Sequence, residues 1–205
     1  MRWLLPEAMY WQVPTKEKKI YLTFDDGPTE DITPIILELL RQYNVKATFF
    51  CVGENITKHP DEFQAILNAG HAVGNHSFNH LKGWKTDNKT YFDNIEKCNQ
   101  LHPFELFRPP YGKISPRQAR HLSKQYCIVL WSVLSYDFKK SLLPEACLKN
   151  VIEHTNLGSI VVFHDHFKAY QNMIYALPRF IEYYLEKEYS FEILSKNDFP
   201  KSLNS

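Results

Sequence analysis

Short apolar runs alternate along this chain with amphipathic segments that begin at helix-capping residues. The apolar runs are rich in β-branched and aromatic residues, as strands buried in a sheet are. Strands that alternate with helices favour a parallel α/β architecture. A barrel and an open doubly wound sheet both satisfy the pattern, because strand spacing does not separate them. The expected strands are residues 20–24, 46–52, 71–75, 105–108, 127–133, 159–163 and 190–194.

The segments between these runs carry start and stop signals of helices. Thr33 is expected to be the N-cap of the first helix, with Pro34 at its first position. Pro178 is expected to kink or split the last helix, because proline cannot donate a backbone hydrogen bond. That last helix is expected from about residue 171 to 187. The other helices are expected at residues 60–70, 88–99, from 115, and from 144 to about 158.

Length and charge restrict the class of protein. The chain has 205 residues, enough for a single domain over 1–205. With 24 basic and 23 acidic residues the formal charge is +1, which gives no electrostatic support for a nucleic acid or anionic membrane partner. No signal-peptide pattern and no run of about 20 apolar residues is seen, so the chain as written is expected to be cytoplasmic. The sequence does not specify an oligomeric state.

The four cysteines, Cys51, Cys98, Cys127 and Cys147, form no CxxC motif. Three of them lie in apolar runs, where a free cysteine behaves as a small hydrophobic residue. All four are expected to be reduced.

Ionisable side chains follow nearly every expected strand. Since functional groups of parallel α/β folds gather at the carboxyl ends of strands, these side chains are expected to share one rim. They are Asp25 and Asp26, His76 and His80, Arg108 and Tyr111, Asp137, and His164 with Asp165.

The adjacent carboxylates of Asp25 and Asp26 repel each other unless they are solvated or compensated. One interpretation is a solvated turn before a glycine and a proline. The other is a cation at this end of the strand. His76 and His80 are spaced so that a helix would point both imidazoles one way, although two unrelated loop histidines would show the same spacing. Together with one carboxylate they form an open Asp-His-His metal site, and the second carboxylate stays free as a general base.

Three further side chains have both a structural and a catalytic interpretation. His164 follows an apolar run, so it is either a satisfied core histidine or a general acid. Asp137 is the candidate carboxylate that orients His164. Arg108 either forms a structural ion pair or holds the catalytic aspartate. The six other histidines, His59, His71, His102, His121, His154 and His166, are interpreted as structural or surface residues.

Five motifs occur in a recognisable order: "TFDDGP", "HSFNH", "RPPYG", "WSVLSYDF" and "IVVFHD". Over about residues 20–166 the chain resembles the polysaccharide deacetylases of carbohydrate esterase family four. The resemblance implies an α/β fold that is an incomplete, distorted (β/α) barrel with about seven parallel strands. It also implies a divalent metal, most often zinc, with cobalt or nickel as alternatives.

The resemblance also implies roles for individual residues. Asp25 matches the catalytic base, His164 the catalytic acid, and Asp26, His76 and His80 the metal ligands. The remaining matches are Arg108, which positions the base; Asp137, which tunes the acid; the backbone N–H of Tyr111, an oxyanion donor next to Pro110; and Ser77, which supports the metal-binding loop.

The chain departs from the family pattern at three positions. Leu134 stands where many relatives have an acidic residue. Phe138 replaces a frequent tryptophan, and Val162 replaces a usual leucine, in motifs whose apolar side chains help form the acetyl pocket. These changes concern substrate shape and not the metal or the base.

The implied reaction is metal-dependent removal of N-acetyl groups from amino-sugar polysaccharides or oligosaccharides. The carbohydrate substrate is then the expected partner. One alternative is an O-acetyl esterase acting on glycans such as acetylated xylan. Another is a catalytically silent carbohydrate-binding domain, although such a domain has no need of a base and an acid.

Overall fold

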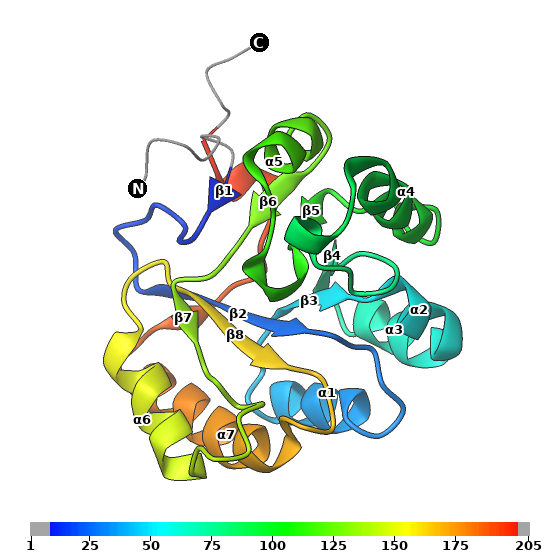
Figure 1. Ribbon diagram of the computed structural model, residues 1–205. Helices are drawn as coiled ribbons and strands as arrows, with labels where there is room; N and C mark the ends of the chain where they lie inside the picture. The colour runs from blue at the N-terminus through cyan, green and yellow to red at the C-terminus, as the bar shows by residue number, and fades with distance from the viewer. Residues whose placement is uncertain (1–8, 201–205) are drawn as a thin grey trace.

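The structure is a computed structural model that describes residues 9–200. Its centre is a curled parallel sheet with helices packed around the outside (Figure 1). The strand order is β1-β6-β5-β4-β3-β2-β8-β7, and β9 pairs with β2 beside this path. The strands are β1 Met9–Tyr10, β2 Lys19–Asp25, β3 Thr48–Cys51, β4 Ala72–Asn75, β5 Leu106–Phe107, β6 Cys127–Val129, β7 Val133–Leu134, β8 Ile160–His164 and β9 Ser190–Phe191.

The expected incomplete α/β barrel is confirmed, with nine strands in the described residues instead of seven. The helices are α1 Thr33–Gln42, α2 Gly53–Lys58, α3 Pro60–Asn68, α4 Asn88–Asn99, α5 Pro116–Leu122, α6 Pro144–His154 and α7 Tyr170–Glu186. Short 3₁₀ turns lie at Gly83–Lys85, Pro110–Gly112 and Lys196–Asp198.

The barrel is incomplete because one expected strand, residues 127–133, forms two. β6 pairs with β5 and with β1, the strand at one edge of the sheet, whereas β7 forms the other edge and pairs with β8. Between them the Leu130 N–H donates to Tyr10 and the Ser132 N–H donates to Ile160. The chain therefore crosses from β6 to the far edge of the sheet within three residues and leaves a seam there.

Other expectations need correction. Thr33 is not an N-cap: it is the first residue of α1, and its hydroxyl donates to Asp165 instead. Pro178 does not split α7, which runs unbroken for 17 residues. The short helix α2 and the strand β1 were not expected at all. The helix expected from residue 115 is confirmed as α5, with Ser115 as its N-cap in a capping box, and all four cysteines are free and buried. Within residues 9–200 no helix is both long and apolar enough to span a membrane.

Alternation along the strands separates two apolar clusters. Leu22, Phe24 and Phe163 face the helices in the larger cluster. Tyr21, Phe50 and Ile160 belong to the smaller cluster on the inner face of the sheet. Because side chains alternate with a period of two, the inner positions continue through Thr23 to Asp25 on β2 and through Val162 to His164 on β8. The alternation of side chains along β2 and β8 thus places Asp25 and His164 on the inner side of the barrel, at the end where these strands finish.

Candidate functional site

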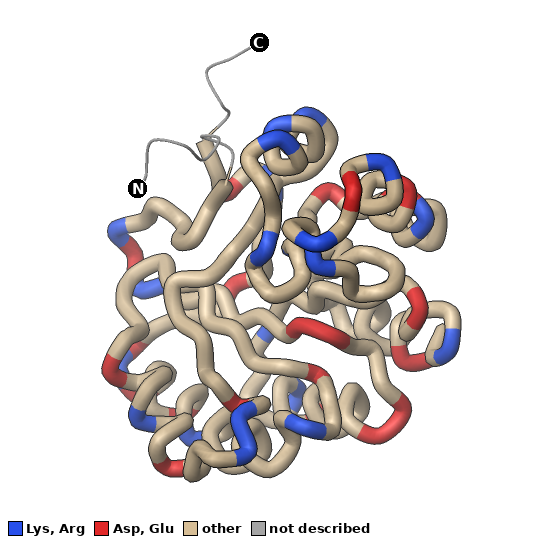
Figure 2. Tube along the Cα trace, in the orientation of Figure 1, with Lys and Arg blue, Asp and Glu red and all other residues tan. Residues whose placement is uncertain are grey.

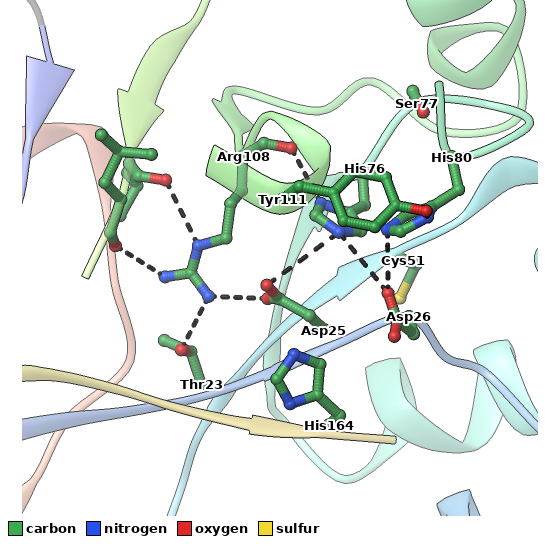
Figure 3. Close-up of polar contacts among 12 residues, drawn as sticks. Thr23, Asp25, Asp26, Cys51, His76, Ser77, His80, Arg108, Tyr111 and His164 are labelled. Carbon is green, nitrogen blue, oxygen red and sulfur yellow. Dashed lines mark hydrogen bonds and ion pairs between the residues drawn. The ribbon is translucent and has the colours of Figure 1, made fainter. Parts of the chain in front are cut away.

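Asp25 ends β2 and is buried against Arg108 (Figure 3). Arg108 Nη1 donates to Asp25 Oδ1 at 2.7 Å and to Thr23 Oγ1 at 2.8 Å. Its other donors reach the carbonyls of Val129, at 3.2 Å, and Leu130, at 2.9 Å. The guanidinium is fully buried and held by four acceptors, so it fixes one carboxylate oxygen of Asp25. The second oxygen, Oδ2, faces His76 Nε2 at 4.0 Å.

Asp26 lies next to two imidazoles instead. His80 Nε2 is 3.1 Å and His76 Nε2 is 3.6 Å from Asp26 Oδ1. Burial opposes ionisation of Asp26, but the His80 hydrogen bond and the surrounding imidazoles outweigh it and hold the pKa of Asp26 below its usual range. One ligand atom from each of the three residues lies within 4.8 Å of the others. The expected Asp-His-His cluster is therefore brought together.

The segment from His76 to His80 is a loop, so helical spacing is not what joins the two imidazoles. Three residues have left-handed backbone angles: Asp26 at φ 79°, Ser77 at φ 60° and His80 at φ 56°. Side-chain hydrogen bonds hold the backbone at two of these residues, Asp26 and Ser77. Asn55 Nδ2 donates to the Asp26 carbonyl at 2.7 Å, and the Ser77 N–H donates to Asn75 Oδ1 at 2.8 Å.

The donor set fits a divalent metal such as zinc. Two imidazole nitrogens and one carboxylate oxygen are the ligands of an open zinc site, whose ligand atoms lie about 3.3 Å apart around a tetrahedral ion. His76 Nδ1 is 2.8 Å from the Arg108 carbonyl, which leaves Nε2 for an ion. Burial lowers the pKa of His76 to about 4, so the imidazole is neutral, as a ligand must be.

His164 and Asp137 form a second polar pair across the mouth. His164 Nδ1 is 2.7 Å from Asp137 Oδ1, and the His164 N–H donates to Asp137 Oδ2 at 2.8 Å. Asp137 is fully buried. Burial acts to lower the pKa of His164, but the Asp137 carboxylate outweighs it and raises that pKa to about 9. The imidazole is thus held protonated near neutral pH, as a general acid requires.

Tyr111 borders the three-ligand cluster. Its backbone is left-handed, with φ 61°, and its hydroxyl is 3.1 Å from His80 Nδ1. The ring stands beside the imidazoles in Figure 3 and is half exposed. The Tyr111 side chain thus supports His80, a candidate metal ligand, in addition to any role of its backbone N–H.

A cleft of about 540 Å³ contains these groups. Phe138 lines it and packs edge-on against His164, at 4.9 Å between ring centroids. Pro110 and Val162 are buried and are not among its lining residues. Residues without an expected role do line it: Val52, Glu54, Asn55, Asn79, Trp131, Leu134, His166 and Lys168.

Sequence reasoning also missed the function of Asp165 in the local structure. Its carboxyl accepts hydrogen bonds from the hydroxyls of Thr33, at 2.5 Å, and Thr29, at 3.1 Å. The Asp165 N–H donates to the Asp25 carbonyl at 2.8 Å. A Cβ on Gly27 would lie 2.1 Å from Asp165 Oδ2, so only glycine fits there. Asp165 therefore anchors the turn that follows the two aspartates. In the sequence, Asp165 is the second residue of the "HD" pair after the strand, and a role was assigned only to the histidine.

Comparisons with known proteins match this chain to one family. The polysaccharide deacetylase family model matches residues 12–127. A peptidoglycan-N-acetylglucosamine deacetylase of Bacillus cereus is 36% identical over 169 residues, which are 79% of this chain and 61% of the relative. A second one from Bacillus cereus is 33% identical over 91% of both chains.

A solved structure shares the whole architecture. It is a peptidoglycan N-acetylglucosamine deacetylase in complex with 4-naphthalen-1-yl-N-oxidanyl-benzamide, with a TM-score of 0.86 and 34% identity over 91% of each chain. With a family match over more than half its length and relatives of this similarity, the chain belongs to the polysaccharide deacetylase family.

Proposed function

We propose that this protein is a metal-dependent hydrolase that removes N-acetyl groups from amino-sugar polysaccharides or oligosaccharides. The observation that carries the proposal is that the adjacent carboxylates of Asp25 and Asp26 have different partners. Asp26 joins the histidine cluster, while Asp25 keeps one oxygen free 4.0 Å from His76 Nε2. A free base beside a metal site is the arrangement that hydrolysis of an amide needs.

Asp26, His76 and His80 would hold the ion, and the two imidazole ligands favour zinc. Bound there, the ion supplies Lewis-acid polarisation of the acetyl carbonyl. Asp25 takes the proton of the attacking water at Oδ2, because Arg108 occupies Oδ1. Arg108 thus acts as a positioning residue for the base.

Two further groups serve the oxyanion and the leaving group. The Tyr111 N–H donates to the oxygen of the tetrahedral intermediate as negative charge develops there. His164 gives its proton to the departing amine from Nε2, since Nδ1 is held by Asp137. Base and acid therefore come from neighbouring strands, where Asp25 and His164 are register partners.

The relatives support an amide substrate, since those compared are peptidoglycan N-acetylglucosamine deacetylases. The match covers 61% of the length of the first of these relatives. The amide substrate is therefore proposed for this protein and not taken over from the relative. An ester of acetylated xylan would use the same base and acid. A silent binding domain is not favoured, because it would not need a protonated histidine across from a free carboxylate.

The test is acetate release from N-acetylglucosamine oligomers and from acetylated xylan, with chelator-treated protein before and after zinc is restored. Zinc-restored release from the oligomers is expected. Asp25→Asn should lower this activity about 10²- to 10⁴-fold while zinc binding, measured by calorimetry, persists. Asp61→Asn, on the exposed surface of α3, is the matched control and should keep full activity. A fully active Asp25→Asn protein would refute the assignment of the base.

A further inference from the structure

The ligand loop, defined as residues 76–80 with His76 and His80 at its ends, is held by a side chain from a distant part of the sequence. The N–H groups of Phe78 and Asn79, in the middle of the loop, both donate to Asn94 Oδ1, at 2.9 and 3.1 Å. Asn94 Nδ2 donates in turn to Asn79 Oδ1 at 2.9 Å. One side chain therefore fixes the backbone between the two histidines with three hydrogen bonds.

Asn94 lies in the middle of α4, where asparagine does not favour the helix. Its short amide competes with the backbone for hydrogen bonds, so asparagine is less favourable than alanine inside a helix. Figure 2 shows charged residues of both signs along α4, and Lys89 and Asp93 form an exposed ion pair there. Asn94 is half-buried, and its side-chain hydrogen bonds within residues 9–200 all go to the ligand loop. The loop, and not the helix, therefore explains this asparagine.

A second helix, α2, binds carbonyl groups of the same loop. The Gly53 N–H donates to the Ser77 carbonyl at 3.0 Å, and the Glu54 N–H donates to the Phe78 carbonyl at 2.9 Å. A Cβ on Gly53 would lie 2.6 Å from Cδ2 of the Phe78 ring, so helix and loop are in close contact. The ligand loop thus has two carbonyls bound by α2 and two N–H groups bound by Asn94 of α4.

The loop needs such support because its backbone is strained. Ser77 and His80 are left-handed, with φ 60° and 56°, a conformation that costs free energy for residues other than glycine. The two N–H groups that Asn94 accepts lie between these residues. Without Asn94 those N–H groups would turn to water, and the backbone could relax to more favourable angles. His80 Nε2 would then no longer be held 3.1 Å from Asp26 Oδ1.

Resting on the metal site of the proposed function, we propose that Asn94 is a positioning residue that preorganises the ligand loop for the ion. Asn94 does not line the cleft and is not one of the three candidate ligands, so it acts through the loop backbone on the two histidines. Loss of its hydrogen bonds should weaken zinc binding about 10- to 100-fold, as removal of groups that orient metal ligands does.

The test is the Kd of zinc, measured on chelator-treated protein by competition with a chromogenic chelator. Asn94→Ala removes all three hydrogen bonds and introduces a good helix former. Asn94→Asp keeps an oxygen that can accept from Phe78 and Asn79, so it should recover much of the affinity. Asn99→Ala is the matched control and should bind zinc as wild type does. Asn99 is half-buried on the same helix, and its Oδ1 accepts from the Phe104 N–H at 3.2 Å, away from the ligand loop.

The thermal midpoint of the metal-free proteins separates positioning from general stability. Similar midpoints for Asn94→Ala and Asn99→Ala, with a weaker zinc Kd in Asn94→Ala alone, support the proposal. Excess zinc should then restore acetate release by Asn94→Ala, because Asp25 and His164 lie on other strands.

The remaining outcomes separate this proposal from the proposed function. Wild-type zinc affinity in Asn94→Ala, or an equal loss of affinity in Asn99→Ala, overturns the role of Asn94 while the proposed function stands. The expected pattern of zinc affinities without acetate release by the zinc-loaded wild type overturns the proposed hydrolase alone. No zinc binding by the wild type overturns both.

Discussion

Asp25 and Asp26 are adjacent in sequence but belong to different subsites. Asp25 continues the inner face of β2 and meets a buried arginine. Asp26 has a left-handed backbone, which aspartate tolerates better than most residues, and this turns its carboxylate to the histidines. The repulsion between the two charges is thus offset on one side by Arg108 and on the other by the imidazoles. Neither carboxylate is a solvated turn residue.

The pairing of His164 with Asp137 predicts a pH effect. The acid must be protonated to act, so activity falls as the pH rises through the pKa of His164, which Asp137 raises to about 9. Asp137→Asn removes the charge and leaves burial as the main influence, which lowers that pKa. The alkaline limb of the profile of kcat/KM against pH should therefore move down by about one unit or more.

Zinc content and folding of Asp137→Asn are checked by metal analysis and circular dichroism. Asp61→Asn, on the outer surface of α3, should keep the wild-type profile. An alkaline limb that stays in place in Asp137→Asn would show that His164 is not tuned by this carboxylate.

At the level of elements, the alternation of strands and helices predicted a parallel α/β fold, and the family resemblance, not the alternation, predicted the incomplete barrel. The polar helix expected at 88–99 matches α4, where Asp87 caps the N-terminus by accepting from Thr90. The division of residues 127–133 was not predictable, because the apolar run continues through the crossing at Leu130. Pairing with two different strands, and not local composition, breaks that run.

The candidate site was predicted by residue type and by strand end, but its geometry was not. The convergence of Asp26, His76 and His80 depends on left-handed residues and on amide side chains of Asn55 and Asn75. Such backbone angles are rarely readable where the residue is not glycine. Likewise, Asp165 was expected on the same rim as His164 but was given no role, and only the fold brings it to Thr29 and Thr33 in the segment between β2 and α1.

The turn after β2 should depend on this carboxyl. Asp165→Asn replaces an oxygen that accepts from Thr33 with an amide that donates, so one buried hydrogen bond is lost. Such a loss costs about 1–3 kcal/mol of the free energy of unfolding, measured by urea denaturation. Thr33→Val should cost a similar amount, and the double variant should cost less than the sum, because both changes break the same bond.

The comparison variant is Thr57→Val, in which the lost hydroxyl donates to a carbonyl within α2. Its change in unfolding free energy should add to that of Asp165→Asn without coupling. Full additivity between Asp165→Asn and Thr33→Val would contradict the role of Asp165 as the anchor of the turn.

On the scale of the whole molecule, the candidate metal site joins strands that are not neighbours. Asp26 follows β2 and the two histidines follow β4, while β3 lies between these strands. The barrel also has a seam between its edge strands, β1 and β7, so the described strands do not close it with a continuous ring of hydrogen bonds. An ion bound to all three residues would connect loops on both sides of β3 in the folded state only.

Zinc should therefore raise the thermal midpoint of unfolding. A ligand at 100 times its Kd that binds only the folded state adds about 2.7 kcal/mol, and for a protein of this size that corresponds to a rise in Tm of about 5–11 °C. His76→Ala should lose most of this rise because it removes a buried ligand, whereas His154→Ala, on the exposed surface of α6, should keep it. The measurement is calorimetry of chelator-treated protein with and without zinc. An equal rise in wild type and His76→Ala would place the stabilising ion elsewhere, and no rise in wild type would contradict a metal centre at Asp26, His76 and His80.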